Sequence, residues 1–136
     1  MSCSSAIYTS NQNVAVAANG VIPFGSVNRR FGCNCQLNGN DIMCCGRGYY
    51  EVNASVSLTP VAAGLIGVQL YEDGSPVAGA SAFTTGTAGD TITLPLPALV
   101  RVKCDSAKSL SIHLVSPDGA TTGATVVSMP VTVKKV

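Results

Sequence analysis

Residues 46–60, GRGYYEVNASVSLTP, carry the clearest pattern in the chain. After the opening glycines the sequence alternates strictly, and its apolar side chains fall on one face: Tyr50, Val52, Ala54, Val56 and Leu58. The positions between them are polar: Glu51, Asn53, Ser55 and Ser57. Because successive side chains of a β-strand point to opposite faces, this pattern predicts a long strand with one face in a core.

Other parts of the chain show shorter runs with the same period, separated by turn residues. No segment shows convincing helical periodicity. Pro95 and Pro97 lie inside one run, and because proline cannot donate to a ladder, this strand should be irregular or lie at an edge. About ten strands at this spacing predict an all-β sandwich or barrel. We expect strands near residues 6–9, 14–18, 21–24, 26–31, 33–37, 40–45, 48–59, 66–72, 77–84, 91–102, 110–115 and 126–136.

The composition fits this fold class and indicates assembly. The chain has 136 residues, enough for one domain with its own core. Only 11% of the residues are charged, compared with about a quarter in ordinary globular domains. A surface with so few charges gives little protection against association. We therefore expect part of it to be buried in an oligomer.

The charge and hydropathy patterns disfavour several classes of protein. The formal net charge is +1, and the basic residues cluster only at Arg29-Arg30 and Lys134-Lys135, so we expect no nucleic-acid partner. No stretch approaches the roughly 18 apolar residues of a membrane helix, so we expect no membrane partner. The first residues, MSCSSAIYTSN, have neither a positive lead nor an apolar run. We expect synthesis in a cytoplasm without a secretory signal.

The cysteines are the most conspicuous reactive residues. Four of the six flank the dipeptide Asn38-Gly39, which is a strong hairpin signal. With these two residues as the turn, Cys33 faces Cys44 across the hairpin. The full set is Cys3, Cys33, Cys35, Cys44, Cys45 and Cys104.

In this register Cys35 faces Ile42, and one face gathers Cys33, Cys35 and Cys44 while Cys45 is turned away. Directly opposed side chains are close enough to relax into a disulfide. The spacing is Cys-x-Cys and Cys-Cys, not the Cys-x2-Cys of structural zinc sites. The pattern therefore favours buried reduced thiols first, a Cys33–Cys44 disulfide second and a metal site last.

No motif indicates an enzyme. His113 is the only histidine, and it falls on the strand face opposite Leu110, Ile112 and Leu114, where we expect it to be exposed or at a subunit contact. The neighbouring serines have no Gly-x-Ser-x-Gly turn around them. A lone histidine with no acid and serine nearby in the sequence is a poor catalytic candidate.

Five segments, taken in order, carry a resemblance to a known family. They are IPFGSVN (22–28), an apolar–Phe segment leading to an asparagine; GYYEV (48–52), a central Gly-x-Tyr strand; LYEDG (70–74), a strand and turn; and LSIHL (110–114) and VTV (131–133). Their order and spacing resemble the tumour necrosis factor-like and complement globular-head-like jelly rolls. The likeness covers residues 6–136.

The resemblance implies a two-sheet jelly-roll sandwich assembled as a tight homotrimer, with both termini near one end. The small, Ala/Gly/Thr-rich sequence is most similar to the bacterial and phage branch of the family. On this basis we expect a non-enzymatic structural or attachment protein on a virion surface, as a capsid decoration, head-fibre or tail protein. Its partners would be other virion or particle-surface proteins. The alternatives are a module that binds a cell-surface glycan or receptor, and a bacterial spore-surface protein.

The calcium sites of many animal members are not carried over to this chain. Calcium needs about 6–8 converging oxygen ligands, and only Glu72 and Asp73 are neighbours among the acids. The others are scattered singly, so we expect no cofactor: Asp41, Glu51, Asp90, Asp105 and Asp118.

Two regions are candidates for assembly contacts. The polar face of the opening strand would either face solvent or pack near the three-fold axis, where small side chains allow close approach; it comprises Glu51, Asn53, Ser55 and Ser57. Residues 1–5 precede the first expected strand, and we take them as an anchor segment separate from the 6–136 jelly-roll domain. The candidate anchor residues are Met1, Ser2 and Cys3.

Overall fold

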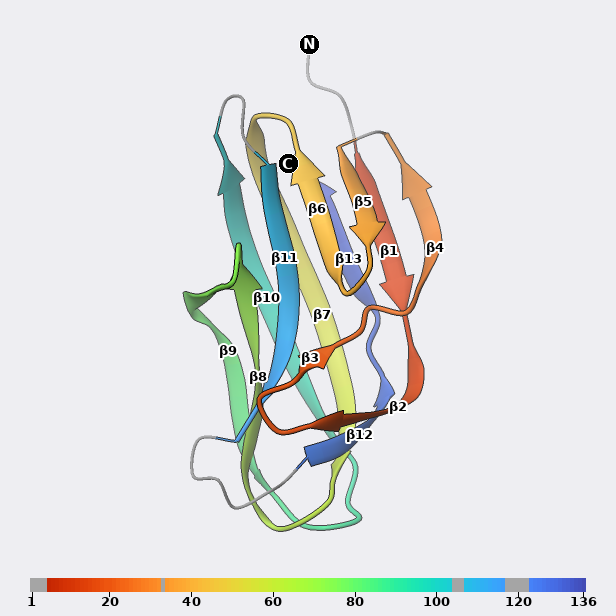
Figure 1. The fold of residues 1–136 in the computed structure, drawn as a ribbon, viewed down its shortest axis with the longest axis vertical. Coiled ribbons are helices and arrows are strands. Elements are labelled where there is room, and N and C mark those ends of the chain that lie inside the picture. The colour runs from red at the N-terminus through yellow and green to blue at the C-terminus, as the bar shows by residue number, and fades with distance from the viewer. Residues whose placement is uncertain (1–4, 33, 104–106, 117–122) are drawn as a thin grey trace.

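The computed structural model describes residues 5–32, 34–103, 107–116 and 123–136, and these residues form an all-β sandwich (Figure 1). Two antiparallel sheets of seven and six strands lie face to face, with the apolar sides of both strand sets buried between them. The described residues contain no helix that is long and apolar enough to cross a membrane.

The first sheet follows the order β2-β12-β7-β13-β1-β4, and β10 pairs with the other edge of β7. Its strands are β1 (Ala6–Ser10), β2 (Gln12–Ala17), β4 (Ser26–Phe31), β7 (Gly48–Pro60), β10 (Ile92–Val102), β12 (Gly123–Ser128) and β13 (Val131–Lys135).

The second sheet follows the order β5-β6-β11-β8-β9, and β3 pairs with β11. Its strands are β3 (Val21–Ile22), β5 (Cys35–Asn38), β6 (Asp41–Cys45), β8 (Gly64–Glu72), β9 (Ser75–Gly86) and β11 (Ala107–Val115).

The long alternating strand is confirmed and lies at the centre of the first sheet. The five apolar side chains of β7 are at most 2% exposed, from Tyr50 to Leu58. β7 pairs with β10 along one edge and with β13 and β12 in succession along the other. One strand thus holds together three others, because both of its edges are hydrogen-bonded along nearly their whole length.

The strand that contains Pro95 and Pro97, β10, lies at an edge of the first sheet, as its prolines require. β10 pairs with β7 through eleven residues, with Pro95 opposite Ser55 and Pro97 opposite Asn53. Among the described residues the other edge of β10 has no partner strand. A missing N–H costs nothing when it faces an unpaired edge, so the edge position is confirmed.

The cysteine hairpin has a different register from the predicted one. Asn38 pairs with Asp41 and Leu37 with Ile42, so the turn residues are Gly39 and Asn40. This register places two apolar side chains against each other, whereas the predicted one places Leu37 against the polar Asn40. The predicted pairings of Cys35 with Ile42 and of Cys33 with Cys44 are therefore wrong, since Cys44 faces Cys35.

The end of the chain was predicted as one strand over residues 126–136, and this is also wrong. It forms two strands, β12 and β13, separated at Met129 and Pro130. β12 lies between β2 and β7, while β13 lies between β1 and β7. The break lets two short strands follow each other along the same edge of β7.

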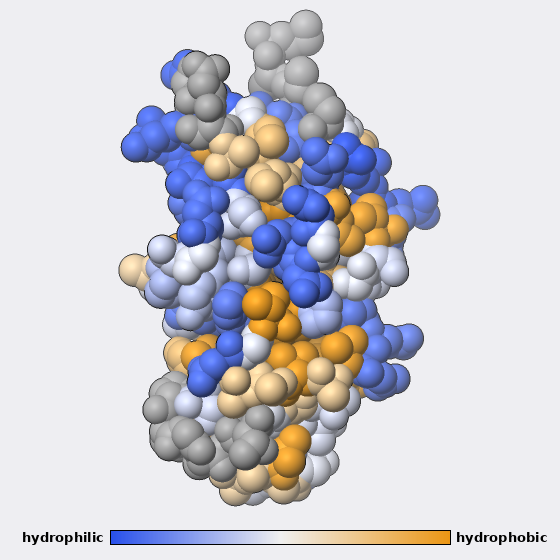
Figure 2. Space-filling model, in the orientation of Figure 1, coloured by the Kyte–Doolittle hydropathy of each residue, from blue (hydrophilic) through white to orange (hydrophobic). Residues whose placement is uncertain are grey.

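Both described ends of the chain lie at one end of the sandwich. The Lys135 N–H donates to the Ser5 carbonyl at 2.9 Å, and Figure 1 shows the start of β1 and the end of β13 at the same end of the sandwich. On the face seen in Figure 2, hydrophilic side chains are concentrated toward this end, and apolar ones gather across the middle and lower part. Hydrophilic side chains also lie beside the apolar ones in the middle and lower part.

Candidate functional site

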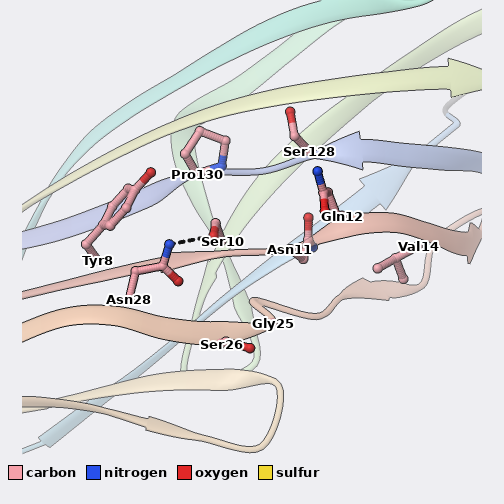
Figure 3. Close-up of a pocket in the computed structure, with 10 residues that line it drawn as sticks. All are labelled: Tyr8, Ser10, Asn11, Gln12, Val14, Gly25, Ser26, Asn28, Ser128 and Pro130. Atoms are coloured by element: carbon pink, nitrogen blue, oxygen red, sulfur yellow. Dashed lines mark hydrogen bonds between the residues drawn. The ribbon is translucent and has the colours of Figure 1, made fainter.

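A polar groove lies on the first sheet, where β1 meets β2 beside the start of β4 (Figure 3). Its volume is about 670 Å³. The lining contains amides, hydroxyls and one aromatic ring but no charged side chain. The lining residues are Tyr8, Ser10, Asn11, Gln12, Val14, Gly25, Ser26, Asn28, Ser128 and Pro130.

Backbone conformation brings the walls of this groove together. Gly25, between β3 and β4, has a φ of 85°, in the left-handed region that favours glycine. A Cβ at this position would collide with the Ser10 carbonyl and with the Asn11 backbone and Cβ. The absence of a side chain therefore allows the β3–β4 connection to pass directly against the β1–β2 connection.

One hydrogen bond joins two residues of the groove, and a second amide at its wall is incompletely satisfied. Asn28 Nδ2 donates to Ser10 Oγ at 2.9 Å, and Asn11 Nδ2 donates to the Pro23 carbonyl. Asn11 is 9% exposed, and its Oδ1 has no hydrogen-bond partner among the described residues. A buried acceptor without a donor costs about 1–3 kcal/mol. A hydroxyl or amide donor would relieve that cost.

A second groove carries positive charge at the end of the molecule where the termini lie. Its volume is about 530 Å³, and its lining residues are Arg47, Gly48, Tyr49, Arg101, Val102 and Lys103. Within the described part of the chain, ion pairs involve only Lys108, which contacts Glu72 at 2.9 Å and Asp73 at 3.4 Å. Arg101 and Lys103 are close in the sequence, but Arg47 is far from both, so the groove was not visible as one basic cluster there.

Two of the predicted cluster cysteines meet inside the sandwich. Cys35 and Cys44 are both 0% exposed, and their Sγ atoms are 2.8 Å apart. Cys45 is exposed, and Cys33 lies outside the described residues. No three His, Cys, Asp or Glu side chains among the described residues lie close enough together to hold a metal ion.

The predicted contact face of β7 lies on the outside of the first sheet. Glu51, Asn53 and Ser55 are exposed, and the half-buried Ser57 shares a hydrogen bond of 3.0 Å with Thr93. The adjoining β10 adds Leu99, which is 59% exposed. This face, which we call the outer face, combines small polar side chains, prolines and an exposed leucine. Its role in subunit contact stays a prediction.

His113 is half-buried in a small aromatic contact. Its ring stacks on Tyr71 with centroids 3.8 Å apart, and its Nε2 lies 3.3 Å from Ser111 Oγ. Burial lowers the pKa of His113, although the Asp41 carboxylate acts in the opposite direction. Among the described residues no carboxylate hydrogen-bonds to the imidazole, so this serine and histidine do not form a catalytic triad.

The candidate anchor residues Met1, Ser2 and Cys3 lie outside the described residues. Neither groove was predicted from the sequence. The polar groove gathers side chains from three segments and the basic groove from two. Only IPFGSVN drew attention to one wall of the polar groove, through Gly25 and Asn28.

Comparison with solved structures decides which sandwich this is. Murine APRIL at pH 5.0 superimposes with a TM-score of 0.74 at 8% identity, over 98% of this chain and 100% of that chain. The globular domain of the zebrafish complement 1qA protein gives a TM-score of 0.70 at 13% identity, over 97% and 96%. The chain has the tumour necrosis factor-like jelly-roll fold. No protein-family model and no curated protein sequence matches it.

A viral protein shares this tumour necrosis factor-like fold. The vertex protein P5 of the phage PRD1 gives a TM-score of 0.59 at 17% identity, over 97% of this chain and 96% of that chain. At these identities the likeness concerns the fold alone. The role of the two grooves and of the outer face must therefore be argued from this chain's own residues.

Proposed function

We propose that this chain forms a homotrimer and acts as a non-enzymatic structural or attachment protein on the surface of a phage virion. The observation that carries the proposal is the outer face of the first sheet. Beyond Glu51 it carries no charged side chain from Asn53 to Ser57 or from Pro95 to Leu99, and Leu99 is 59% exposed there. An isolated subunit gains nothing from such a face, whereas a subunit contact would bury it.

A second surface of complementary character lies at the β9–β10 edge. A groove of about 190 Å³ there is lined by small and apolar residues: Val77, Ala78, Gly79, Ala80, Pro97, Ala98 and Leu99. Two different surfaces that bind head to tail generate a closed ring when the rotation between subunits is suitable. Because Pro97 and Leu99 belong to the outer face as well, the distinct part of this second surface is its β9 side, formed by residues 77–80. Three subunits would close this ring if the β9 side of each packs on the next outer face.

Placement on a phage virion is supported by the fold shared with the PRD1 vertex protein and by the basic groove beside the termini. The domain formed by residues 6–136 would then dock through this end, where Arg47, Arg101 and Lys103 fit an acidic particle surface. Residues 1–5, with Met1, Ser2 and Cys3, would serve as the anchor. The virion is the proposed location of the mature protein.

The mass of the native protein in solution tests the trimer. Asn53→Lys places three like charges on the proposed contact and should convert the trimer to monomers in analytical ultracentrifugation. Asn40→Lys changes the same residue type at the exposed hairpin turn and should leave the mass unchanged. A monomeric wild-type protein at tens of micromolar would overturn the trimer. Co-sedimentation of the wild type with phage capsids tests the location.

A second candidate function is glycan binding, favoured specifically by the polar groove. Uncharged amides and hydroxyls beside Tyr8 suit a neutral polyhydroxylated ligand, since sugars present donors and acceptors together with apolar faces that pack on aromatic rings. Glycan-array binding that is lost in Asn28→Ala and retained in Asn40→Ala would support this function. Absence of binding to any glycan would exclude it.

A further inference from the structure

The facing pair of Cys35 and Cys44 occupies the position at which antiparallel strands come closest. The Cys45 N–H donates to the Asn34 carbonyl at 2.7 Å, so residues 34 and 45 form a hydrogen-bonded pair. The next pair, 35 and 44, is therefore non-hydrogen-bonded, with an expected Cα separation of about 4.5 Å. That separation lies inside the range that a disulfide spans, about 4.4–6.8 Å.

We propose that Cys35 and Cys44 form a redox-controlled pair, which a small-molecule disulfide such as oxidised glutathione converts into an intrachain disulfide joining β5 to β6. The reduced form corresponds to the cytoplasmic state of the thiols, and the oxidised form to the state outside a cell. The proposal concerns the chain itself and holds whether or not the trimer forms.

The surroundings give the two thiols different roles. Either thiol can donate the hydrogen bond between the two sulfurs. With Cys44 as the donor, this bond lowers the pKa of Cys35, and the cations of Arg30 and Lys135 act in the same direction, against the effect of burial. The same hydrogen bond and burial raise the pKa of Cys44. Cys35 is therefore the nucleophile and Cys44 the resolving thiol, because the thiolate is the reactive form.

The chemistry balances as two exchanges. The Cys35 thiolate attacks one sulfur of oxidised glutathione, forming a mixed disulfide and releasing one glutathione thiolate. Cys44 then loses its proton to water and attacks the Cys35 sulfur, and the second glutathione leaves as a thiolate. The protein loses two electrons and two protons, and the external disulfide is reduced to two glutathione thiols.

Both thiols are buried, so the first exchange requires a local opening. β5 has four residues and lies at the edge of the second sheet, and short edge strands separate more readily than central ones. Once formed, the disulfide ties this edge strand to β6 and prevents the same opening. Oxidation would thus prevent β5 from separating again from β6, and would protect an exposed sheet edge.

The test uses the full-length protein with Cys3, Cys33, Cys45 and Cys104 replaced by serine, so that only the proposed pair remains. Incubation with oxidised glutathione should remove the mass of two hydrogen atoms and yield a peptide crosslinked between Cys35 and Cys44. The Tm should rise by about 5–10 °C relative to the sample treated with dithiothreitol. Low urea concentrations should accelerate the oxidation, because they favour opening of β5.

The control carries Cys35→Ser and Cys44→Ser in addition, and its Tm should be the same under both conditions. Peptide mapping of the oxidised wild type provides a second readout. Two thiols that stay free after prolonged oxidation in low urea would overturn the proposal. So would a wild-type disulfide that joins Cys33 to either member of the pair, or one that forms only between chains.

Discussion

At the scale of single residues, position 25 has the most stringent requirement for glycine. Gly25 combines a φ of 85° with a position where a Cβ would meet backbone atoms of Ser10 and Asn11. Gly25→Ala should therefore lower the free energy of unfolding by about 2–4 kcal/mol, through backbone strain and the displacement of the β1–β2 connection. The shift in the midpoint of urea unfolding measures this loss, provided that the slope of the free energy of unfolding against urea concentration is the same in both proteins.

Gly39→Ala is the matched control for that substitution. Gly39 also has a positive φ, of 63°, but open space surrounds the position of its missing Cβ. Only the conformational cost applies there, about 1 kcal/mol. Equal losses in the two variants would show that the close approach at Gly25 contributes nothing to stability.

At the scale of elements, the link between β6 and β7 depends on the Tyr50 hydroxyl. It lies 2.8 Å from the carbonyl oxygens of both Cys45 and Gly46, which share its single proton. Tyr50→Phe leaves these carbonyls without that donor. The free energy of unfolding, measured by heat or urea, should therefore fall by about 1–3 kcal/mol. Tyr49→Phe, at an exposed ring on the same strand, should change stability by less than about 0.5 kcal/mol.

The same hydroxyl predicts a dependence on alkaline pH. Burial, together with the nearby Cys35 and Cys44 thiols, raises the pKa of Tyr50 from 10.0 to about 12. Since the folded state keeps its proton longer than the unfolded state, the stabilisation is complete below pH 10 and declines as the pH rises toward 12. Wild-type protein should lose stability over this interval relative to Tyr50→Phe. If the stability of the two proteins depended on pH in the same way over this interval, the raised pKa would not belong to Tyr50.

How far an element is predictable depends on whether its pattern is local. β7 was predicted correctly because the alternation of Tyr50 to Leu58 is visible within the strand itself. The hairpin register failed because Asn38-Gly39 and Gly39-Asn40 both suit a two-residue turn, and the choice depends on which residue faces Ile42. The basic groove was missed because Arg47 meets Arg101 and Lys103 only through the pairing of β7 with β10.

At the scale of the whole molecule, the separation of surfaces is the central feature. The cations gather near the termini, while the outer face and the β9–β10 edge are nearly free of charge along the middle of the sandwich. A chain with 11% charged residues cannot cover every surface with charge. Its cations are instead concentrated toward one end, as expected if the sides are covered by neighbouring subunits and the end contacts another partner.

Leu99 distinguishes this explanation from simple solvent exposure. Leu99→Lys introduces a cation opposite Glu51 on the neighbouring strand, a pairing that is favourable within one subunit, so the isolated fold should not suffer. If the outer face is a contact, three buried cations should dissociate the trimer, and the dependence of Tm on protein concentration should disappear. Val61→Lys is the control, because Val61 is similarly exposed, 61% against 59%, but lies in the loop after β7. Sedimentation of both variants decides the matter: a trimer that survives Leu99→Lys would place the contact elsewhere.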